Sequence, residues 1–226
     1  MAVYNTMKEL LEDKAGRVVA ACRSQNSVAM HTTRLFRRDS PVAIIAPHGG
    51  KIEHDTSQIA EKIAGARYNF FSFEGDMRKD NHATLHVTST RYDAPDQALD
   101  LISNCSFVVA IHGAADIEQA NGKPDMTVYI GGRNRPYRSA IQATLDLVAQ
   151  QSGLGEFRTA IHPNPNLQGE NRLNICNRGN HPDGGVQLEL SSSLRKHLGE
   201  HDANEMDDLA KFSKAIQGVI DALVRS

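Results

Sequence analysis

Two histidines stand at the ends of short apolar runs, and a glutamate closely follows the first of them. His48 ends the run in VAIIAPHGG, Glu53 comes five residues later, and His112 ends the run in FVVAIHGAA. Two imidazoles and one carboxylate that leave a fourth position open form the ligand set of a catalytic zinc ion, whereas structural zinc sites use four protein ligands. His48, Glu53 and His112 are therefore the candidate ligands of one Zn2+.

The same residue types also have ordinary structural uses. A histidine can cap a turn, a glutamate can stabilise a helix N-terminus, and a second histidine can be hydrogen-bonded within a core. The spacing between His48 and Glu53 is not a specific motif. Spacing alone therefore leaves the metal site and the structural interpretation open.

Amide hydrolysis by a metal centre needs a further carboxylate. Zinc acidifies its bound water toward a pKa of about 7 and polarises the scissile carbonyl, but a separate base must take the water's proton and pass it to the departing nitrogen. Glu189 is the candidate, because alternation in VQLEL sends Gln187 and Glu189 to the face opposite the aliphatic residues. If this strand is an edge strand, Glu189 faces solvent instead. Other carboxylates compete: Glu74 could serve in the site or bond a neighbouring loop, and Asp116 could orient a ligand imidazole or stand in a surface turn.

These side chains need a sheet whose strands end at a common edge. Residues 42–46 and 107–111 are continuous apolar runs, as in strands covered on both faces. Further strands are predicted at 68–73, 85–88, 127–130 and 186–190, short strands and turns within 17–40, and helices at 56–64, 97–103, 137–151 and 205–224. The alternation predicts an α/β fold: a single domain over 1–226, with an open, mixed or mostly parallel sheet and helices on both faces. Sites in such folds lie outside the carboxyl ends of the strands.

Composition narrows the class of protein. The 226 residues, with 40% hydrophobic and 23% charged side chains, suit a globular domain and exclude disordered and collagen-like chains. No apolar run approaches the roughly 20 residues that cross a bilayer, so no membrane association is expected. The N-terminus lacks the apolar stretch of a secretory signal peptide, so we expect action in the cytoplasm or, for a phage-encoded protein, release by host lysis. Oligomeric state is left open.

Seven segments occur in an order that resembles a known family. They are APHGGKIEHDTSQIAEKIAG, FEG (73–75), LHVTSTRYDAP (85–95), AIHGAAD (110–116), VYIGG, NICNRG (174–179) and GVQLELS (185–191). Together, over about residues 40–195, they resemble the phage-type poly-γ-glutamate hydrolases, relatives of the carboxypeptidase A-like zinc peptidases. The resemblance implies a zinc-carboxypeptidase-like fold and one zinc ion at His48, Glu53 and His112. It also implies hydrolysis of γ-glutamyl amide bonds in poly-γ-glutamate, as in the degradation of bacterial capsules by phage.

A polyglutamate substrate carries one free carboxylate per residue, so its cleft should present cations. Arginine suits this task because its planar fork meets a carboxylate with two hydrogen bonds. Arg178 in NICNRG is the first candidate, and Arg133 and Arg135 follow another strand end at the predicted active edge. Asn177 is a candidate donor to the substrate backbone. His86 either lines the pocket or is hydrogen-bonded inside the fold.

Two other functions compete with this one. A zinc amidase or carboxypeptidase that acts on peptidoglycan stem peptides would keep the metal and also meet γ-linked glutamate. A non-enzymatic phage replication factor that binds nucleic acid is the alternative from another class. The net charge of −2, the 5% aromatic content and the absence of tryptophan count against it. Nucleic acid is therefore not expected as a partner.

Overall fold

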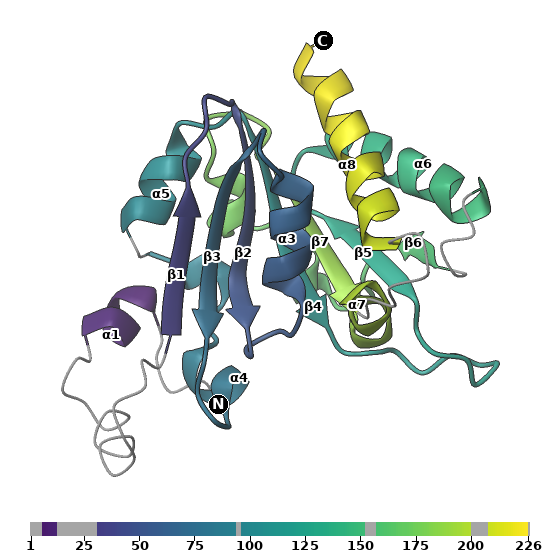
Figure 1. The fold of residues 1–226 in the computed structure, drawn as a ribbon, viewed down its shortest axis with the longest axis horizontal. Helices are drawn as coiled ribbons and strands as arrows, with labels where there is room; N and C mark the ends of the chain where they lie inside the picture. The colour runs from purple at the N-terminus through teal and green to yellow at the C-terminus, as the bar shows by residue number, and fades with distance from the viewer. Residues whose placement is uncertain (1–5, 13–30, 94–95, 152–156, 200–207, 226) are drawn as a thin grey trace.

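The computed structural model describes residues 6–12, 31–93, 96–151, 157–199 and 208–225. Within these residues one seven-stranded sheet has the order β1-β3-β2-β4-β7-β5-β6 (Figure 1). Its strands are β1 (His31–Phe36), β2 (Val42–Gly50), β3 (Asn69–Gly75), β4 (Phe107–Ala114), β5 (Thr127–Gly131), β6 (Arg158–Ala160) and β7 (Val186–Ser191). The sheet class predicted from the sequence is thus confirmed.

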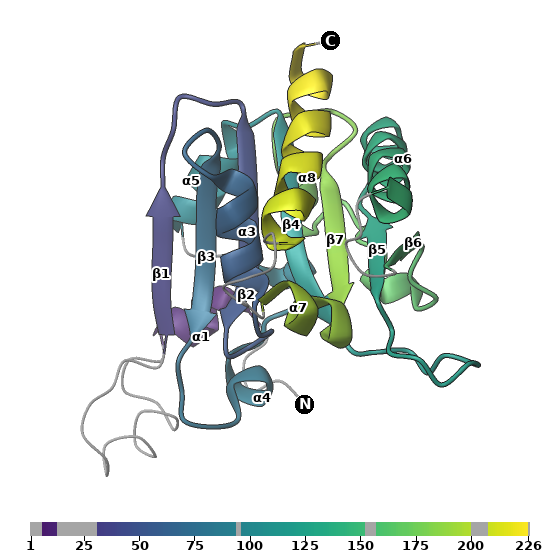
Figure 2. The same cartoon turned by 45° about the vertical axis from the view of Figure 1, so that its right-hand side comes forward.

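The strand directions make the sheet mixed around a parallel centre. Strands β3, β2, β4 and β7 are parallel to one another, so their carboxyl ends meet at one edge. Strand β1 is antiparallel to β3, β5 is antiparallel to β7, and β6 is parallel to β5. The arrowheads in Figure 2 show β1 pointing opposite to β3 and β7. The carboxyl ends of β1, β5 and β6 therefore lie at the other edge.

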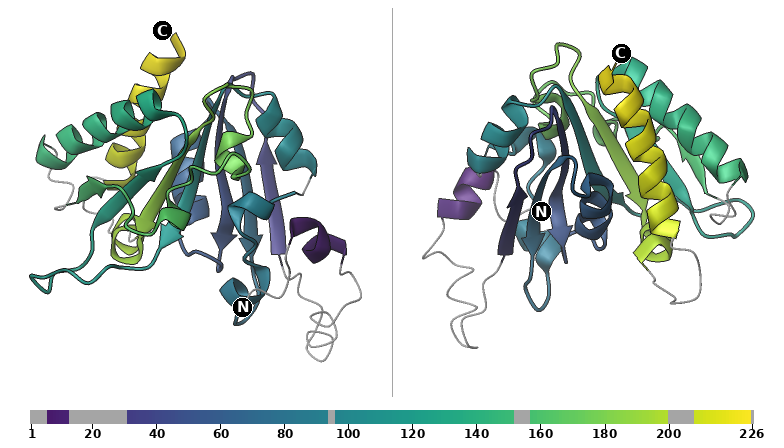
Figure 3. Two further views of the ribbon diagram at one scale, coloured as in Figure 1. Left: turned by 180° about the vertical axis from the view of Figure 1, so that it is seen from behind. Right: turned by 45° about the horizontal axis from the view of Figure 1, so that its top comes forward.

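Helices cover both faces of the sheet. The first face carries α3 (Thr56–Ala64), α6 (Arg135–Gln151), α7 (Ser192–Gly199) and α8 (Asp208–Arg225). The second face carries α1 (Met7–Glu12), α4 (Asn81–Leu85), α5 (Asp96–Ser103) and the 3-10 turn η3 (Ile175–Asn177). Figure 3 shows α3 and α8 together on one side of the sheet and α5 on the other. Two further 3-10 turns are η1 (Ser89–Arg91) and η2 (Pro165–Leu167).

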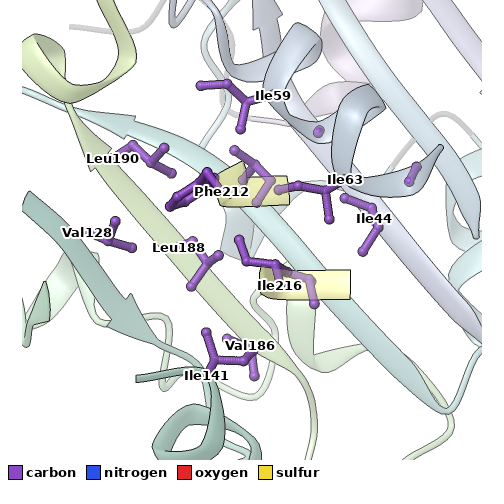
Figure 4. Packing of buried hydrophobic residues seen from close by; sticks show 14 of the residues in the cluster. Ile44, Ile59, Ile63, Val128, Ile141, Val186, Leu188, Leu190, Phe212 and Ile216 are labelled. Atoms are coloured by element: carbon purple, nitrogen blue, oxygen red, sulfur yellow. The ribbon is translucent and has the colours of Figure 1, made fainter. Parts of the chain in front are cut away.

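The core on the first face joins the C-terminal helix to the centre of the sheet. Phe212 and Ile216 of α8 are fully buried and lie among Ile63 of α3 and Leu188 and Leu190 of β7 (Figure 4). Burial of each such side chain contributes about 1.5–3 kcal/mol. This packing stabilises β7, the strand that carries Glu189.

Across the described segments, helix length and hydropathy fall short of what a membrane-spanning helix needs.

One predicted strand, residues 85–88, is wrong. Leu85 ends α4, and the backbone N–H of His86 still donates to the carbonyl of His82. Strand β3 has no free edge for another partner, because it already pairs with β1 and β2. The apolar pattern that suggested a strand comes partly from Val87, whose side chain is buried in the core on the second face. The predicted helix at 205–224 is present from Asp208, and residues 205–207, like 17–30, lie outside the described residues.

Candidate active site

His48, Glu53 and His112 meet at the carboxyl ends of β2 and β4. All three are buried, and β2 and β4 are parallel neighbours. His48 Nδ1 lies 3.1 Å from Glu53 Oε1 and 3.1 Å from His112 Nδ1. His112 Nδ1 lies 3.6 Å from Glu53 Oε2. The structure therefore brings the three predicted ligands together.

A tight loop after His48 returns Glu53 to the same point. The pairing of β2 with β3 shifts register between Ala46 and Gly49, and Gly50 adopts a φ of +62°. A Cβ atom at Gly50 would lie 2.6 Å from the carbonyl oxygen of Gly75, so only glycine fits this turn. The Glu53 N–H then donates to the His48 carbonyl at 2.9 Å and closes the loop.

The donor atoms suit a cation. His48 Nε2 lies 2.7 Å from the carbonyl oxygen of Val87, which can only accept, so this nitrogen carries the proton. In the neutral ring Nδ1 then offers a lone pair toward Glu53 and His112, and such a set of facing acceptors needs positive charge between them. Around a tetrahedral zinc ion with bonds of about 2.0–2.1 Å, neighbouring ligand atoms lie about 3.3 Å apart. The distances of 3.1 to 3.6 Å fit that spacing.

Glu53 is held as a carboxylate. Burial raises the pKa of its carboxyl group, but the neighbouring imidazoles of His48, His112 and His86 outweigh burial and hold the pKa well below its usual range. The backbone N–H of Gly113 also donates to Oε2 at 2.8 Å. Metal ligands must be deprotonated, so these contacts keep Glu53 in the state that a cation requires.

Glu189 lies beside this cluster. It is on β7, an inner strand between β4 and β5, and its register partner on β4 is His112. Register partners share a face of the sheet, and Glu189 is only 5% exposed, so the solvent-facing alternative is wrong. Burial and the charge of Glu53 raise the pKa of Glu189 well above its usual range, against the opposing charge of Arg195. A cation nearby would lower that pKa again.

Two buried amides orient the Glu189 carboxylate. Gln187 Nε2 donates to Glu189 Oε1 at 2.9 Å, and Gln187 Oε1 accepts from Asn174 Nδ2 at 2.8 Å. Asn174 Oδ1 in turn accepts from the backbone N–H of Cys176 at 3.1 Å. Because a backbone N–H can only donate, it sets the direction of both amides. The alternation in the sequence placed Gln187 on the same face as Glu189, but its role in orienting Glu189 was not predicted. The signal was an amide side chain two residues before the candidate base on the same face of the strand.

Arg195 is a second residue that sequence reasoning missed. Its guanidinium is buried and donates to the backbone carbonyls of His54, Leu190 and Ala114 at 2.6, 3.1 and 3.3 Å. It lies directly on Gly113, where a Cβ atom would come within 2.6 Å of the guanidinium carbon. Arg195 thereby ties the Glu53 loop to the end of β4.

The two competing carboxylates have structural partners. Glu74 Oε1 accepts from Ser72 Oγ at 2.6 Å and lies 3.5 Å from Arg34 Nη1, on the β1 side of the sheet. Asp116 accepts from the backbone N–H and the hydroxyl of Ser193 at 2.9 and 2.6 Å. Asp116 therefore caps the first turn of α7 and does not hydrogen-bond His112.

Arg178 has a structural role on the second face of the sheet. Its guanidinium donates to the backbone carbonyls of Leu173, Tyr92 and Thr90 at 2.8, 2.5 and 3.3 Å. These bonds tie the η1 segment to η3. Contact between Arg178 and substrate stays a prediction.

Two of the candidate arginines, Arg133 and Arg135, lie at another edge of the sheet than expected, and Asn177 is hydrogen-bonded within the fold. Because β5 runs antiparallel to β7, its last residue pairs with Gln187, and Arg133 and Arg135 follow at the opposite edge from His48. The expectation that these arginines share the active edge is wrong, since strand direction leaves no local pattern in the sequence. Asn177 is buried, donates to the carbonyls of residues 169 and 171, and accepts from the N–H of Arg133 and of residue 185. Its amide is thus engaged within the fold.

His86 lies at the site. Its Nε2 is 3.5 Å from Glu53 Oε1, its ring centroid is 4.1 Å from that of His48, and its side chain is 22% exposed. His86 therefore stands between the buried ligands and solvent, as a pocket-lining residue would.

An open α/β sheet here gathers two buried histidines and two buried glutamates near the carboxyl ends of its central strands, where the sites of such folds form. The sequence matches the profile of the family described as poly-gamma-glutamate hydrolase over residues 20–219. The chain belongs to this family of hydrolases.

Individual relatives agree with this membership. The SPbeta prophage-derived UPF0714 protein YoqZ of Bacillus subtilis (strain 168) is 31% identical over 199 residues, which are 87% of this chain and 65% of YoqZ. The chain thus spans slightly less than two thirds of YoqZ. The structure of a bacteriophage poly-gamma-glutamate hydrolase has a TM-score of 0.74 at 22% identity, covering 92% of this chain and 96% of the other. A zinc-free apo structure of YndL has a TM-score of 0.74 at 24% identity, covering 98% of both chains. These structures share the fold.

Proposed function

We propose that this protein hydrolyses γ-glutamyl amide bonds of poly-γ-glutamate with one zinc ion held by His48, Glu53 and His112. The observation that carries the proposal is the meeting of two imidazole nitrogens and a carboxylate within 3.1 to 3.6 Å of one another, beside the buried Glu189. Family membership supports the choice of polymer, and capsule degradation by a phage is part of the same proposal.

In the proposed reaction, the zinc ligands and Glu189 have different roles. Zinc, when bound, supplies Lewis-acid polarisation of the scissile carbonyl and acidifies the attacking water. Glu189 accepts the proton of that water and returns it to the departing nitrogen, as base and then acid. A bound cation would lower the pKa of Glu189 and so favour the carboxylate that accepts the proton, whereas burial favours the carboxylic acid that then donates it to the nitrogen.

Gln187 sets the position and the basicity of Glu189. Its Nε2 donates to Glu189 Oε1, and a donor favours the charged carboxylate. We expect Gln187→Leu to lower kcat by about 10–100-fold, since hydrogen bonds to charged groups are worth about 1.5–3 kcal/mol. The pKa of Glu189 should rise with loss of the donor, so the acidic limb of the kcat/KM pH profile should move to higher pH.

The measurement for Gln187→Leu is a full pH–rate profile beside that of Gln142→Leu. Gln142 is exposed on α6 and offers a matched change away from the site. A Gln187→Leu profile that keeps its acidic limb while kcat falls would assign Gln187 a purely structural role.

The substrate cleft must meet the free carboxylates of the polymer. Arg178 is the candidate, because its guanidinium is bound by backbone carbonyls and has no hydrogen-bonded carboxylate within the described residues, so its positive charge is not cancelled by a direct ion pair. Asn177, whose amide is taken up by the backbone, is a weaker candidate for this contact.

The substrate is tested by comparing two polymers and a set of muropeptides. Purified protein with zinc should shorten γ-polyglutamate, leave α-polyglutamate and muropeptides intact, and lose this activity on treatment with a chelator. The size of the products can be followed by gel filtration. Cleavage of muropeptides alone would contradict the proposal and favour an amidase of peptidoglycan.

A further inference from the structure

A second pair of histidines lies beside Glu53. His82 in α4 and His86 at its C-cap are four residues apart, so both side chains lie on one face of the helical turn. Their rings are stacked with centroids 4.5 Å apart and an interplanar angle of 23°. One nitrogen of each ring and one oxygen of Glu53 all lie within 4.8 Å of one another.

One ring of this pair is exposed and the other is partly buried. His82 is exposed, and His86 lies between it and the buried Glu53. Within the described part of the chain, the His82 ring makes no hydrogen bond, and the only polar contact of the His86 ring is with Glu53. Two imidazoles and a carboxylate suit a borderline divalent metal ion such as Zn2+, Ni2+ or Cu2+.

We infer that Glu53, His82 and His86 form a second site for a divalent transition-metal ion, which shares Glu53 with the centre of His48, Glu53 and His112. This second site binds more weakly than the centre. Its imidazoles are exposed or half-buried, and Glu53 is already engaged by His48 at 3.1 Å and by the Gly113 N–H at 2.8 Å. Two cations on one carboxylate also repel each other, so each ion weakens the binding of the other and the weaker site fills at higher metal concentration.

The sharing of Glu53 links the two sites. An ion at the second site draws the Glu53 carboxylate toward His86 and so weakens its contact with the ion at His48 and His112. By linkage, an ion at the first centre weakens binding at the second site by the same factor. The inference concerns metal binding alone and does not depend on the substrate proposed above.

Stoichiometric titration of the full, metal-free chain with Zn2+ against a chromogenic chelator tests the second site. Wild type should take up two ions in a tight and a weaker step. His82→Ala should lose only the weaker step and bind one ion, whereas Glu53→Gln should lose both steps. The double variant H82A/A83H is the matched control, since it keeps the number of histidines but turns one imidazole by about 100° around the helix. It should also bind one ion.

Two outcomes would overturn the second site: a wild type that saturates at one ion, or a His82→Ala variant that still takes up two. Retention of the tight step in His82→Ala shows that this variant has folded. A wild type that lacks the tight step and keeps the weaker one would contradict the zinc centre of the proposed function instead, so the two failures are distinguishable.

Discussion

Replacement of Glu189 by glutamine is expected to lower kcat/KM on γ-polyglutamate by about 10²–10⁴-fold, the usual contribution of general acid–base catalysis, while bound zinc stays unchanged. Glutamine has the shape of glutamate but cannot accept a proton from water. Glu189 is buried on an inner strand, and burial and the charge of Glu53 favour its neutral form. A neutral side chain of the same size therefore suits the site, and the fold should be retained.

The Glu189→Gln experiment needs zinc content and polymer length from the same preparations. Glu118→Gln is the matched control, because Glu118 is exposed and the chemical change is the same. Wild type and control should each hold about one tightly bound zinc ion and shorten the polymer at the same rate. Full activity in Glu189→Gln would remove Glu189 from the reaction, and loss of its zinc would make Glu189 a ligand rather than the base.

His48→Asn is expected to abolish tight zinc binding and, with it, hydrolysis. His48 occupies the middle of the cluster, 3.1 Å from both Glu53 Oε1 and His112 Nδ1, and the Val87 carbonyl holds its ring at 2.7 Å. Asparagine can place its amide oxygen near the position of Nδ1, but a neutral amide oxygen is a poor substitute for the imidazole nitrogen that zinc binds. Loss of an orienting partner alone weakens metal binding by about 10–100-fold, so loss of the ligand itself should raise the zinc Kd by more than that.

Chelator competition measures the zinc Kd directly, with circular dichroism to confirm folding. His54→Asn makes the same substitution in the same loop at an exposed side chain and should bind zinc as wild type does. Activity removed from wild type by a chelator should return on addition of zinc, whereas His48→Asn should stay inactive. Zinc bound by His48→Asn with wild-type affinity would exclude His48 as a ligand.

Much of the central sheet was predictable because its signals are local. The continuous apolar runs of β2 and β4 are what strands covered on both faces require, and each run ends in its histidine. The alternation in β7 likewise placed Glu189 opposite the aliphatic face. The predicted fold class is confirmed, and the three candidate ligands do lie together.

Other parts of the site depend on contacts between remote segments. Arg195 reaches back to the carbonyl of His54, and Asn174 contacts Gln187 across a loop. Neither contact follows from spacing, because each joins elements that only the folded chain brings side by side. The proximity of His82 to Glu53 is likewise not visible in the sequence, since it arises only when α4 packs at the edge of the sheet.

The sequence by itself determined which strands would be buried and which side chains would stand at their ends, because hydrophobic periodicity depends only on neighbouring residues. The tertiary structure alone decided the direction of β5, which places Arg133 and Arg135 at the opposite edge from His48. It also decided that residues 85–88 form no strand, because Leu85 ends α4 and the His86 N–H donates to the carbonyl of His82. Strand direction and pairing are set by the competition of distant segments for the same hydrogen-bonding edges, and no local pattern records its outcome.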